Sequence, residues 1–168
     1  AVIEEQGDWI KVDIDGEEGY VAAEYVNVTS ELKTALTITE ALYGEGVTDV
    51  RIAICEFAKQ YVGNRYVWGG TSLTKGADCS GFTMSVYRNF GVSLPHSSRA
   101  QAGCGTKISV SEAKPGDLIF YGNGRSINHV AMCIGNGQVV HASNSRTGII
   151  ISNMYYRSPV SAARIIND

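Results

Sequence analysis

The stretch that decides the fold is residues 128–143, which read NHVAMCIGNGQVVHAS. Two apolar, β-branched runs flank the turn-forming triplet Gly-Asn-Gly, and this pattern predicts a β-hairpin. The hairpin holds two of the three histidines of the chain, His129 and His141. A two-residue loop, Asn136-Gly137, would pair Gly135 with Gln138 and place the two histidines on opposite faces of the sheet.

A three-residue loop gives the other register. With Gly137 in the left-handed region, Ile134 pairs with Gln138 and Ala131 pairs with His141. His129 and His141 then lie diagonally on one face, within reach of each other. The glycine on each side of Asn136 favours this arrangement, which we therefore expect.

The segment Asp78-Cys79-Ser80-Gly81-Phe82 predicts the start of a helix. Apolar residues continue at helical spacing to Gly91, and Asp78 is typical of an N-cap. Cys79 then lies in the first turn, where unpaired backbone N–H groups favour a thiolate and can stabilise charge on a carbonyl under attack. A single cysteine at this position is more often a small buried hydrophobe, so the functional interpretation depends on the histidines.

A thiol and two histidines form the three-member set used in nucleophilic catalysis. We expect His129 to act as the base and His141 to orient it, because the orienting residue follows the base along the chain in papain-like proteins. Two hydrogen-bonded, partly buried rings are the structural alternative. A zinc site is weakly supported, because the trio has no further ligand and the four cysteines lack C-x-x-C spacing. We predict no metal and no cofactor, and we assign no role to His96.

The remaining pattern predicts an α+β domain, with helices first and an antiparallel sheet afterwards. A helix is expected from a Thr48 N-cap to Gly63, with an apolar face of Val50, Ala53, Ile54, Phe57, Ala58 and Tyr61. A short helix should follow Pro95, with Ser98 and Gln101 in a capping box. The expected strands are 118–121, 128–134, 138–142, 149–152 and 160–165. Residues 8–28 also have β character, with a turn at Asp15-Gly16.

Composition excludes several classes of protein. The 168 residues include 14 Lys and Arg against 17 Asp and Glu, a net charge of −3 without a basic cluster, so we expect no nucleic-acid binding. No run of about 18 apolar residues is present, which argues against a membrane span. At most one disulfide can form if one of the four cysteines is a working thiol. The chain starts at Ala1, so we expect a processed product or a piece of a longer protein.

Six motifs in order resemble the NlpC-type cysteine peptidases of bacterial cell walls. The resemblance covers about residues 49–166 and implies a papain-like core that cuts peptidoglycan stem peptides, typically between D-γ-glutamate and the L-diamino acid. It implies Cys79 as the nucleophile, His129 as the base and His141 as the third polar residue. The motifs are Tyr66-x-Trp68-Gly69-Gly70, Asp78 to Phe82, Leu94-Pro95-x-x-Ser98-x-x-Gln101, Pro115 to Phe120, His129 to Gly137, and His141-Ala142.

The same resemblance implies further binding residues. Tyr66 matches a hydroxyl that assists the oxyanion site, and Asp78 and Ser80 match positions that hold a free N-terminal amine. His96 departs from the family, because many relatives carry arginine there, and this puts any substrate role of that arginine in doubt.

Residues 1–29 resemble part of a bacterial SH3-like domain, residues 30–48 read as a linker, and residues 49–168 as the peptidase domain. In relatives such domains form one side of the substrate cleft and can supply a tyrosine to it, so the resemblance implies Tyr20 and Tyr25 as candidates for that tyrosine. We expect an extracellular or wall-associated bacterial protein with further wall-binding domains upstream. The alternatives are a non-catalytic wall-binding module, or an amidase or acyltransferase on the same fold.

Overall fold

The computed structural model describes residues 2–14, 16–25, 38–43, 46–124 and 126–166. The chain divides into two compact units, residues 1–37 and 38–168. We describe each unit by itself.

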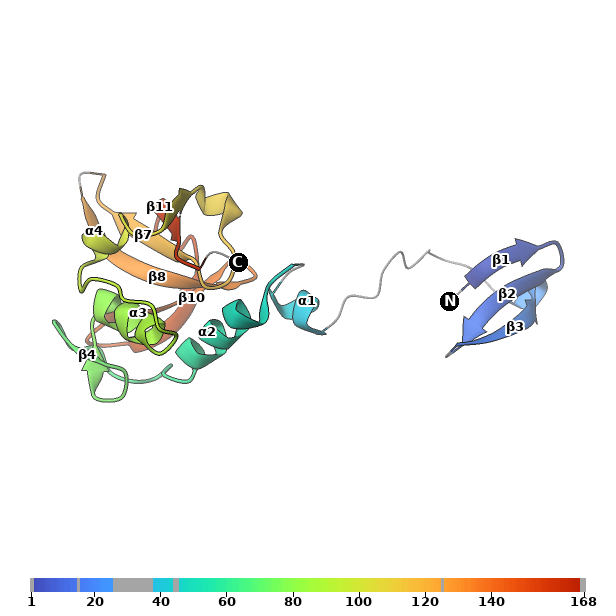
Figure 1. The fold of residues 1–168 in the computed structure, drawn as a ribbon, viewed down its shortest axis with the longest axis horizontal. Helices are drawn as coiled ribbons and strands as arrows, with labels where there is room; N and C mark the ends of the chain where they lie inside the picture. The colour runs from blue at the N-terminus through green and yellow to red at the C-terminus, as the bar shows by residue number, and fades with distance from the viewer. Residues whose placement is uncertain (1, 15, 26–37, 44–45, 125, 167–168) are drawn as a thin grey trace. The chain divides into compact units, whose positions relative to one another are not determined.

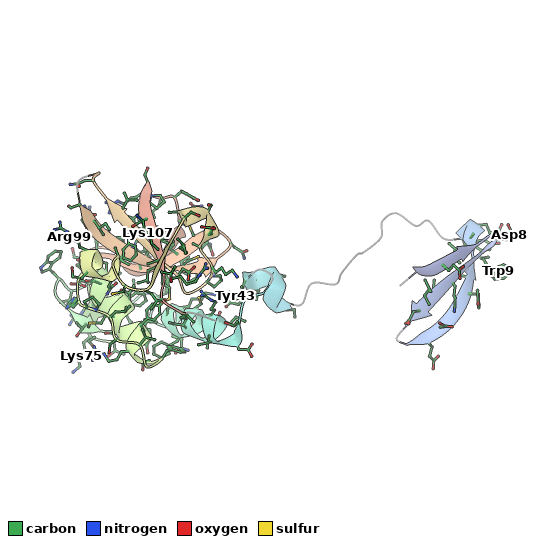
Figure 2. All side chains as sticks on the ribbon, turned by 45° about the horizontal axis from the view of Figure 1, so that its top comes forward. Asp8, Trp9, Tyr43, Lys75, Arg99 and Lys107 are labelled. Atoms are coloured by element: carbon green, nitrogen blue, oxygen red, sulfur yellow. The ribbon has the colours of Figure 1, made fainter. Side chains whose placement is uncertain are left out.

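The first unit is a three-stranded antiparallel meander of β1 (Val2–Gln6), β2 (Trp9–Ile14) and β3 (Glu17–Ala22), followed by the 3-10 turn η1 (Ala23–Tyr25). The two strands expected around Asp15-Gly16 are present, and β1 was not predicted. Tyr25, expected in a strand, lies in η1, and residues 26–28 fall outside the described part. Ile10 is buried, whereas Trp9 is 52% exposed, and Figure 2 shows Asp8 and Trp9 together at one end of the unit. The SH3-like assignment stays a prediction.

The second unit contains a six-stranded antiparallel sheet in the order β10-β9-β8-β7-β11-β6. The strands confirm the five that were expected, each within two residues of its predicted ends, and add β6. Their bounds are β6 Thr106–Ile108, β7 Leu118–Gly122, β8 Ile127–Gly135, β9 Gln138–Asn144, β10 Gly148–Asn153 and β11 Pro159–Arg164.

Two helices, α2 (Asp49–Lys59) and α3 (Cys79–Arg88), pack against this sheet (Figure 1). The main core lies between helices and sheet, and a smaller cluster around Ile119, Tyr121 and Ala131 covers the opposite face. The unit is therefore α+β, as expected. Its remaining elements are short: α1 (Ile38–Tyr43), α4 (Ser98–Gln101), η2 (Val110–Glu112), β4 (Thr71–Ser72) and β5 (Gly76–Ala77).

Two of the short helices correct or extend the sequence analysis. The N-cap of α4 is Ser97, which accepts a hydrogen bond from Ala100 N, so the predicted Ser98–Gln101 capping box is wrong. Helix α1 lies within the predicted linker 30–48 and meets the β8–β9 hairpin, where Asn136 Nδ2 donates to Leu42 O. Residues 30–37 and 44–45 of that range lie outside the described part.

The tip of the β8–β9 hairpin differs from the expected loop. Gly135 pairs with Gln138, so the loop has two residues, Asn136 and Gly137, with φ of 51° and 67°. The three-residue loop is therefore wrong. Two successive residues with positive φ are typical of a type I′ turn, whose twist matches that of the flanking strands.

The expected register nevertheless holds in the body of the hairpin. The next pair beyond the tip is Cys133 with Val139, which leaves Ile134 as an extra residue on β8. This β-bulge shifts the pairing by one residue. Met132 then pairs with Val140, which is the register that follows from the predicted Ala131–His141 pair.

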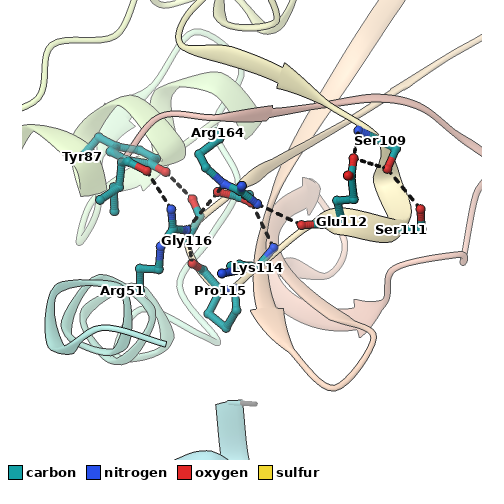
Figure 3. Close-up of polar contacts among 11 residues, drawn as sticks. Arg51, Tyr87, Ser109, Ser111, Glu112, Lys114, Pro115, Gly116 and Arg164 are labelled. Carbon is teal, nitrogen blue, oxygen red and sulfur yellow. Dashed lines mark hydrogen bonds and ion pairs between the residues drawn. The ribbon is translucent and has the colours of Figure 1, made fainter. Parts of the chain in front are cut away.

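Helix α2 is rotated relative to its predicted apolar face. Val50 is 40% exposed and Ala53 is also exposed, whereas Arg51 and Cys55 are buried. Arg51 is buried because its guanidinium finds partners inside: Nη1 lies 2.9 Å from Asp117 Oδ1 and donates to Pro115 O, and Nη2 donates to Ile166 O (Figure 3). Asp117 is wholly buried and also pairs with Arg164 at 2.9 Å.

Candidate active site

Cys79 is the first residue of α3, and Asp78 fixes the geometry around it. The Asp78 carboxylate accepts hydrogen bonds from Gly81 N (2.7 Å), as a helix cap, and from Gly69 N (3.0 Å). It therefore ties the glycine loop ahead of the nucleophile to the helix start, and the predicted N-cap role is confirmed. The two segments approach so closely that a Cβ on Gly81 would lie 2.1 Å from Gly70 O.

The surroundings of Cys79 favour the protonated thiol. Burial raises its pKa above the ordinary value and the Asp78 carboxylate adds to this, whereas the backbone amides of Val130, Ser80 and Cys79 lower it. The amides act as expected for a helix start, but burial outweighs them. The expectation that this position favours a thiolate is thus wrong for the free protein. The Val130 amide also shows that Cys79 lies beside the strand that carries His129.

The two hairpin histidines are in direct contact. His129 Nε2 lies 2.8 Å from His141 Nδ1, and the rings meet edge to face with centroids 5.0 Å apart. The backbone pairing of β8 with β9 runs from Met132 to Gly135, so this side-chain contact joins the strands beyond the end of their ladder. The expectation that both rings share one face is confirmed.

A third polar group extends the chain of contacts. His141 Nε2 lies 3.0 Å from the hydroxyl of Ser152, a residue of β10 that sequence reasoning missed. If His141 donates from Nε2 to Ser152 Oγ, its Nδ1 is an acceptor for His129 Nε2–H. His129 Nδ1 is then the unprotonated ring nitrogen. This arrangement gives His129 one free basic nitrogen, as a general base requires.

Both imidazoles are neutral over the ordinary pH range. Burial, followed by the neighbouring His141 and the Arg157 guanidinium, lowers the pKa of His129 to about 3. Burial and Arg157 lower the pKa of His141 to about 4. At neutral pH the free protein therefore carries uncharged rings at both His129 and His141.

These lowered pKa values predict acid-sensitive stability. The unfolded chain binds protons on both histidines below pH 6.5 while the folded chain does not, so stability is present above pH 6.5 and is lost as the pH falls towards 4. The free energy of unfolding should fall by about 1 kcal/mol per histidine per pH unit in this window. Urea unfolding at pH 7, 6, 5 and 4.5 measures it.

The matched comparison for this prediction is His141→Gln. The variant keeps a polar side chain but removes one titrating group, so its free energy of unfolding should decline less steeply with falling pH. Parallel curves for the two proteins between pH 6.5 and 4.5 would assign the acid sensitivity to other groups.

The other predicted site residues gather around the start of α3. Tyr66 is half-buried, and burial, then the charges of Cys79 and Asp78, raise the pKa of its hydroxyl, which places it within electrostatic range of both. Ser80 is buried and its hydroxyl donates to Asp78 Oδ1 at 3.2 Å. Tyr20 and Tyr25 belong to the first unit, where they are 56% and 81% exposed.

Sequence reasoning missed two neighbours of this cluster. His96 Nε2 lies 2.9 Å and 3.0 Å from the two carboxylate oxygens of Asp78. Gln101 is buried and its amide nitrogen donates to Ser80 O and Pro95 O. The position of His96 after Leu-Pro, where many relatives carry a cation, was the available signal. A histidine there still supplies a group that faces Asp78.

The structure adds further facts on bonding and ligands. All four cysteines are free thiols. Within the described ranges, no group of three or more His, Cys, Asp or Glu side chains is arranged to hold a metal ion. Within the same ranges, no helix is long and apolar enough to cross a membrane.

A cysteine at a helix start, paired histidines on an antiparallel sheet, and a helix that packs on that sheet define a papain-like α+β protein. A model of the NlpC/P60 family matches residues 63–164, more than half of the chain. The chain therefore belongs to the NlpC/P60 family.

Individual relatives agree with this assignment. The chain is 43% identical over 103 residues to a probable endopeptidase p60 of Listeria innocua, covering 61% of this chain and 21% of the relative. It is 41% identical over 120 residues to the murein DD-endopeptidase MepS/murein LD-carboxypeptidase of Escherichia coli, covering 69% and 63% of the two chains. The crystal structure of the NlpC/p60 domain of the peptidoglycan hydrolase SagA matches with a TM-score of 0.63 and 39% identity, over 68% of this chain and 97% of that one. The chain spans about a fifth of the length of the Listeria relative.

Proposed function

We propose that this protein is a cysteine peptidase that hydrolyses the D-γ-glutamyl–L-diamino acid bond of peptidoglycan stem peptides. The observation that carries the proposal is the row of contacts His129–His141–Ser152, which leaves one basic nitrogen on the His129 ring. The next residue of the strand, Val130, has the backbone amide that lowers the pKa of the Cys79 thiol. Peptidoglycan as the substrate is supported by the names of two relatives, the peptidoglycan hydrolase SagA and the murein DD-endopeptidase of E. coli.

The reaction starts with the neutral pair. His129 Nδ1 takes the thiol proton as Cys79 Sγ bonds to the γ-glutamyl carbonyl carbon. The Cys79 backbone N–H and the Tyr66 hydroxyl stabilise the oxyanion. The C–N bond then breaks, and the imidazolium of His129 gives its proton to the leaving amine. Water repeats the sequence on the thioester and releases the γ-carboxylate and the thiol.

His141 and Ser152 hold the base in its working tautomer. His141 Nδ1 accepts from His129 Nε2–H, so the imidazolium that forms on His129 is stabilised by a neutral acceptor rather than by a carboxylate. Asp78 and Ser80 flank Cys79 in the sequence, and a carboxylate at this place would suit the free amine of an N-terminal L-Ala.

One digest tests the proposal. Purified protein is incubated with defined muropeptides, and the products are analysed by mass spectrometry. We expect a new γ-glutamyl carboxylate and a new free amine on the diamino acid. A free lactyl end would indicate an amidase, and cross-linked dimers split with intact stems would indicate the DD-endopeptidase activity named for the E. coli relative. Binding to the wall without any product would indicate a non-catalytic module.

A further inference from the structure

An arginine outside the proposed catalytic set lies within electrostatic range of the histidine pair. Arg157, in the connection between β10 and β11, donates from Nη2 to Asn128 Oδ1 at 3.0 Å, and its Cζ lies 5.9 Å from the centroid of the Tyr121 ring. The same Tyr121 ring contacts His129, with centroids 5.9 Å apart. The contacts with Asn128 and Tyr121 thus hold the Arg157 guanidinium near His129.

Among the residues that the structure describes, Arg157 has no carboxylate partner. Within the part of the chain that the structure describes, the ion pairs of arginine side chains are those of Arg51 and Arg164 with Asp117. The Arg157 charge opposes protonation of both histidines. A cation that disfavours the imidazolium needed during the reaction is unfavourable for catalysis unless an anion joins it in the complex.

We propose that Arg157 and Asn128 form a carboxylate-binding subsite for the residue on the leaving-group side of the scissile bond. The inference rests on the proposed function, because His129 must protonate the leaving amine, and the leaving residue therefore lies against the ring that adjoins Arg157. The Asn128 amide nitrogen adds a second donor. A bound carboxylate also neutralises the charge that opposes protonation of His129.

A surface depression lies at the start of β8, the strand that also carries Asn128. Its volume is about 490 Å³, and its lining includes Ser126, Ile127 and Arg99 but neither Asn128 nor Arg157. Arg99 projects from α4 at the edge of the unit (Figure 2). The side chain of meso-diaminopimelate carries a carboxylate roughly 6 Å from its L-α-carbon, whereas lysine has none. The subsite therefore selects diaminopimelate over lysine.

The test compares kcat/KM for two tetrapeptides, L-Ala-γ-D-Glu-X-D-Ala, in which X is meso-diaminopimelate or L-lysine and its α-carboxyl group is in an amide bond, so that the side-chain carboxylate is what distinguishes the two. We expect the wild-type chain to prefer the first by about tenfold or more, the effect of one charge-assisted pair. Arg157→Gln should lose that preference through a slower reaction of the diaminopimelate peptide alone. Arg157→Lys should keep part of it. Arg146→Gln removes an exposed arginine on the β9–β10 turn and should change neither value.

Three outcomes decide against parts of this scheme. Equal losses on both peptides in Arg157→Gln would make Arg157 a support for the ring cluster only, and an absent wild-type preference would overturn the subsite. If neither peptide is cleaved, the proposed function fails. Calorimetric binding of the two peptides to Cys79→Ala, with and without Arg157→Gln, still measures the subsite in that case.

Discussion

Replacing Cys79 by alanine is expected to lower kcat/KM on stem peptides by about 10⁴-fold or more, because no other group can form the thioester. Cys79→Ser should be inactive to a similar degree. A serine hydroxyl is a much weaker acid than a thiol, and the proposed base is weak, since burial and its neighbours lower the pKa of His129 to about 3. Release of L-Ala-γ-D-Glu, followed by mass spectrometry, measures the loss.

Cys104→Ala is the matched control, because Cys104 is also a partly exposed free thiol. That variant should retain wild-type turnover. Cys79→Ala should unfold at about the wild-type urea concentration, since burial raises the pKa of the thiol and an apolar methyl suits the same space. Persistent turnover in Cys79→Ala would exclude the thiol mechanism.

Replacing Arg51 by methionine is expected to lower the free energy of unfolding by about 3–5 kcal/mol, the cost of breaking a buried ion pair. The change leaves Asp117 wholly buried with only Arg164 as a cationic partner. It also removes the donors to Pro115 O and Ile166 O, which tie α2 to the turn before β7 and to the end of the chain (Figure 3). Urea unfolding at pH 7 measures the effect.

Lys59→Met provides the control on the same helix. Lys59 pairs with Glu56 at 3.0 Å, but that pair is exposed, and exposed pairs contribute about 0–1 kcal/mol. Lys59→Met should therefore unfold within about 1 kcal/mol of the wild-type chain. An Arg51→Met protein as stable as Lys59→Met would show that Asp117 is compensated by Arg164 alone.

Local signals were sufficient for the parts of the site that lie within one element. The Asp78 cap and the apolar spacing after Cys79 placed the thiol at the first residue of α3. The turn residues at 135–137 placed the two histidines on one face, although the loop they form is shorter than expected. These predictions succeeded because helix caps, turns and the alternation of side chains between the two faces of a strand depend on residues that are close in sequence.

The contacts that sequence reasoning missed join distant segments. Ser152 reaches His141 only through the register of β9 with β10, which places Ile150 opposite His141. His96 lies in the loop that follows α3 and contacts Asp78, 18 positions earlier, at the start of that helix. Arg51 is not among the apolar residues that predict the buried face of α2, and its partner Asp117 lies 66 positions away. A buried charge of this kind needs such a partner.

The unpaired Ile134 decides which face of the sheet each residue of β8 shares with the residues of β9. With a two-residue loop and no extra residue on β8, His141 would stand opposite Met132 and its ring would point away from His129. The extra residue Ile134, between the loop and the rest of β8, shifts the pairing by one residue and returns both rings to the same face. Loop length usually varies freely between homologous proteins, but here an insertion or deletion of one residue disconnects the row of contacts, while a change of two preserves it. The number of residues from His129 to His141 can therefore change only by an even number if the two rings are to stay on one face. Neither strand pairing nor hydrophobic packing alone imposes this condition.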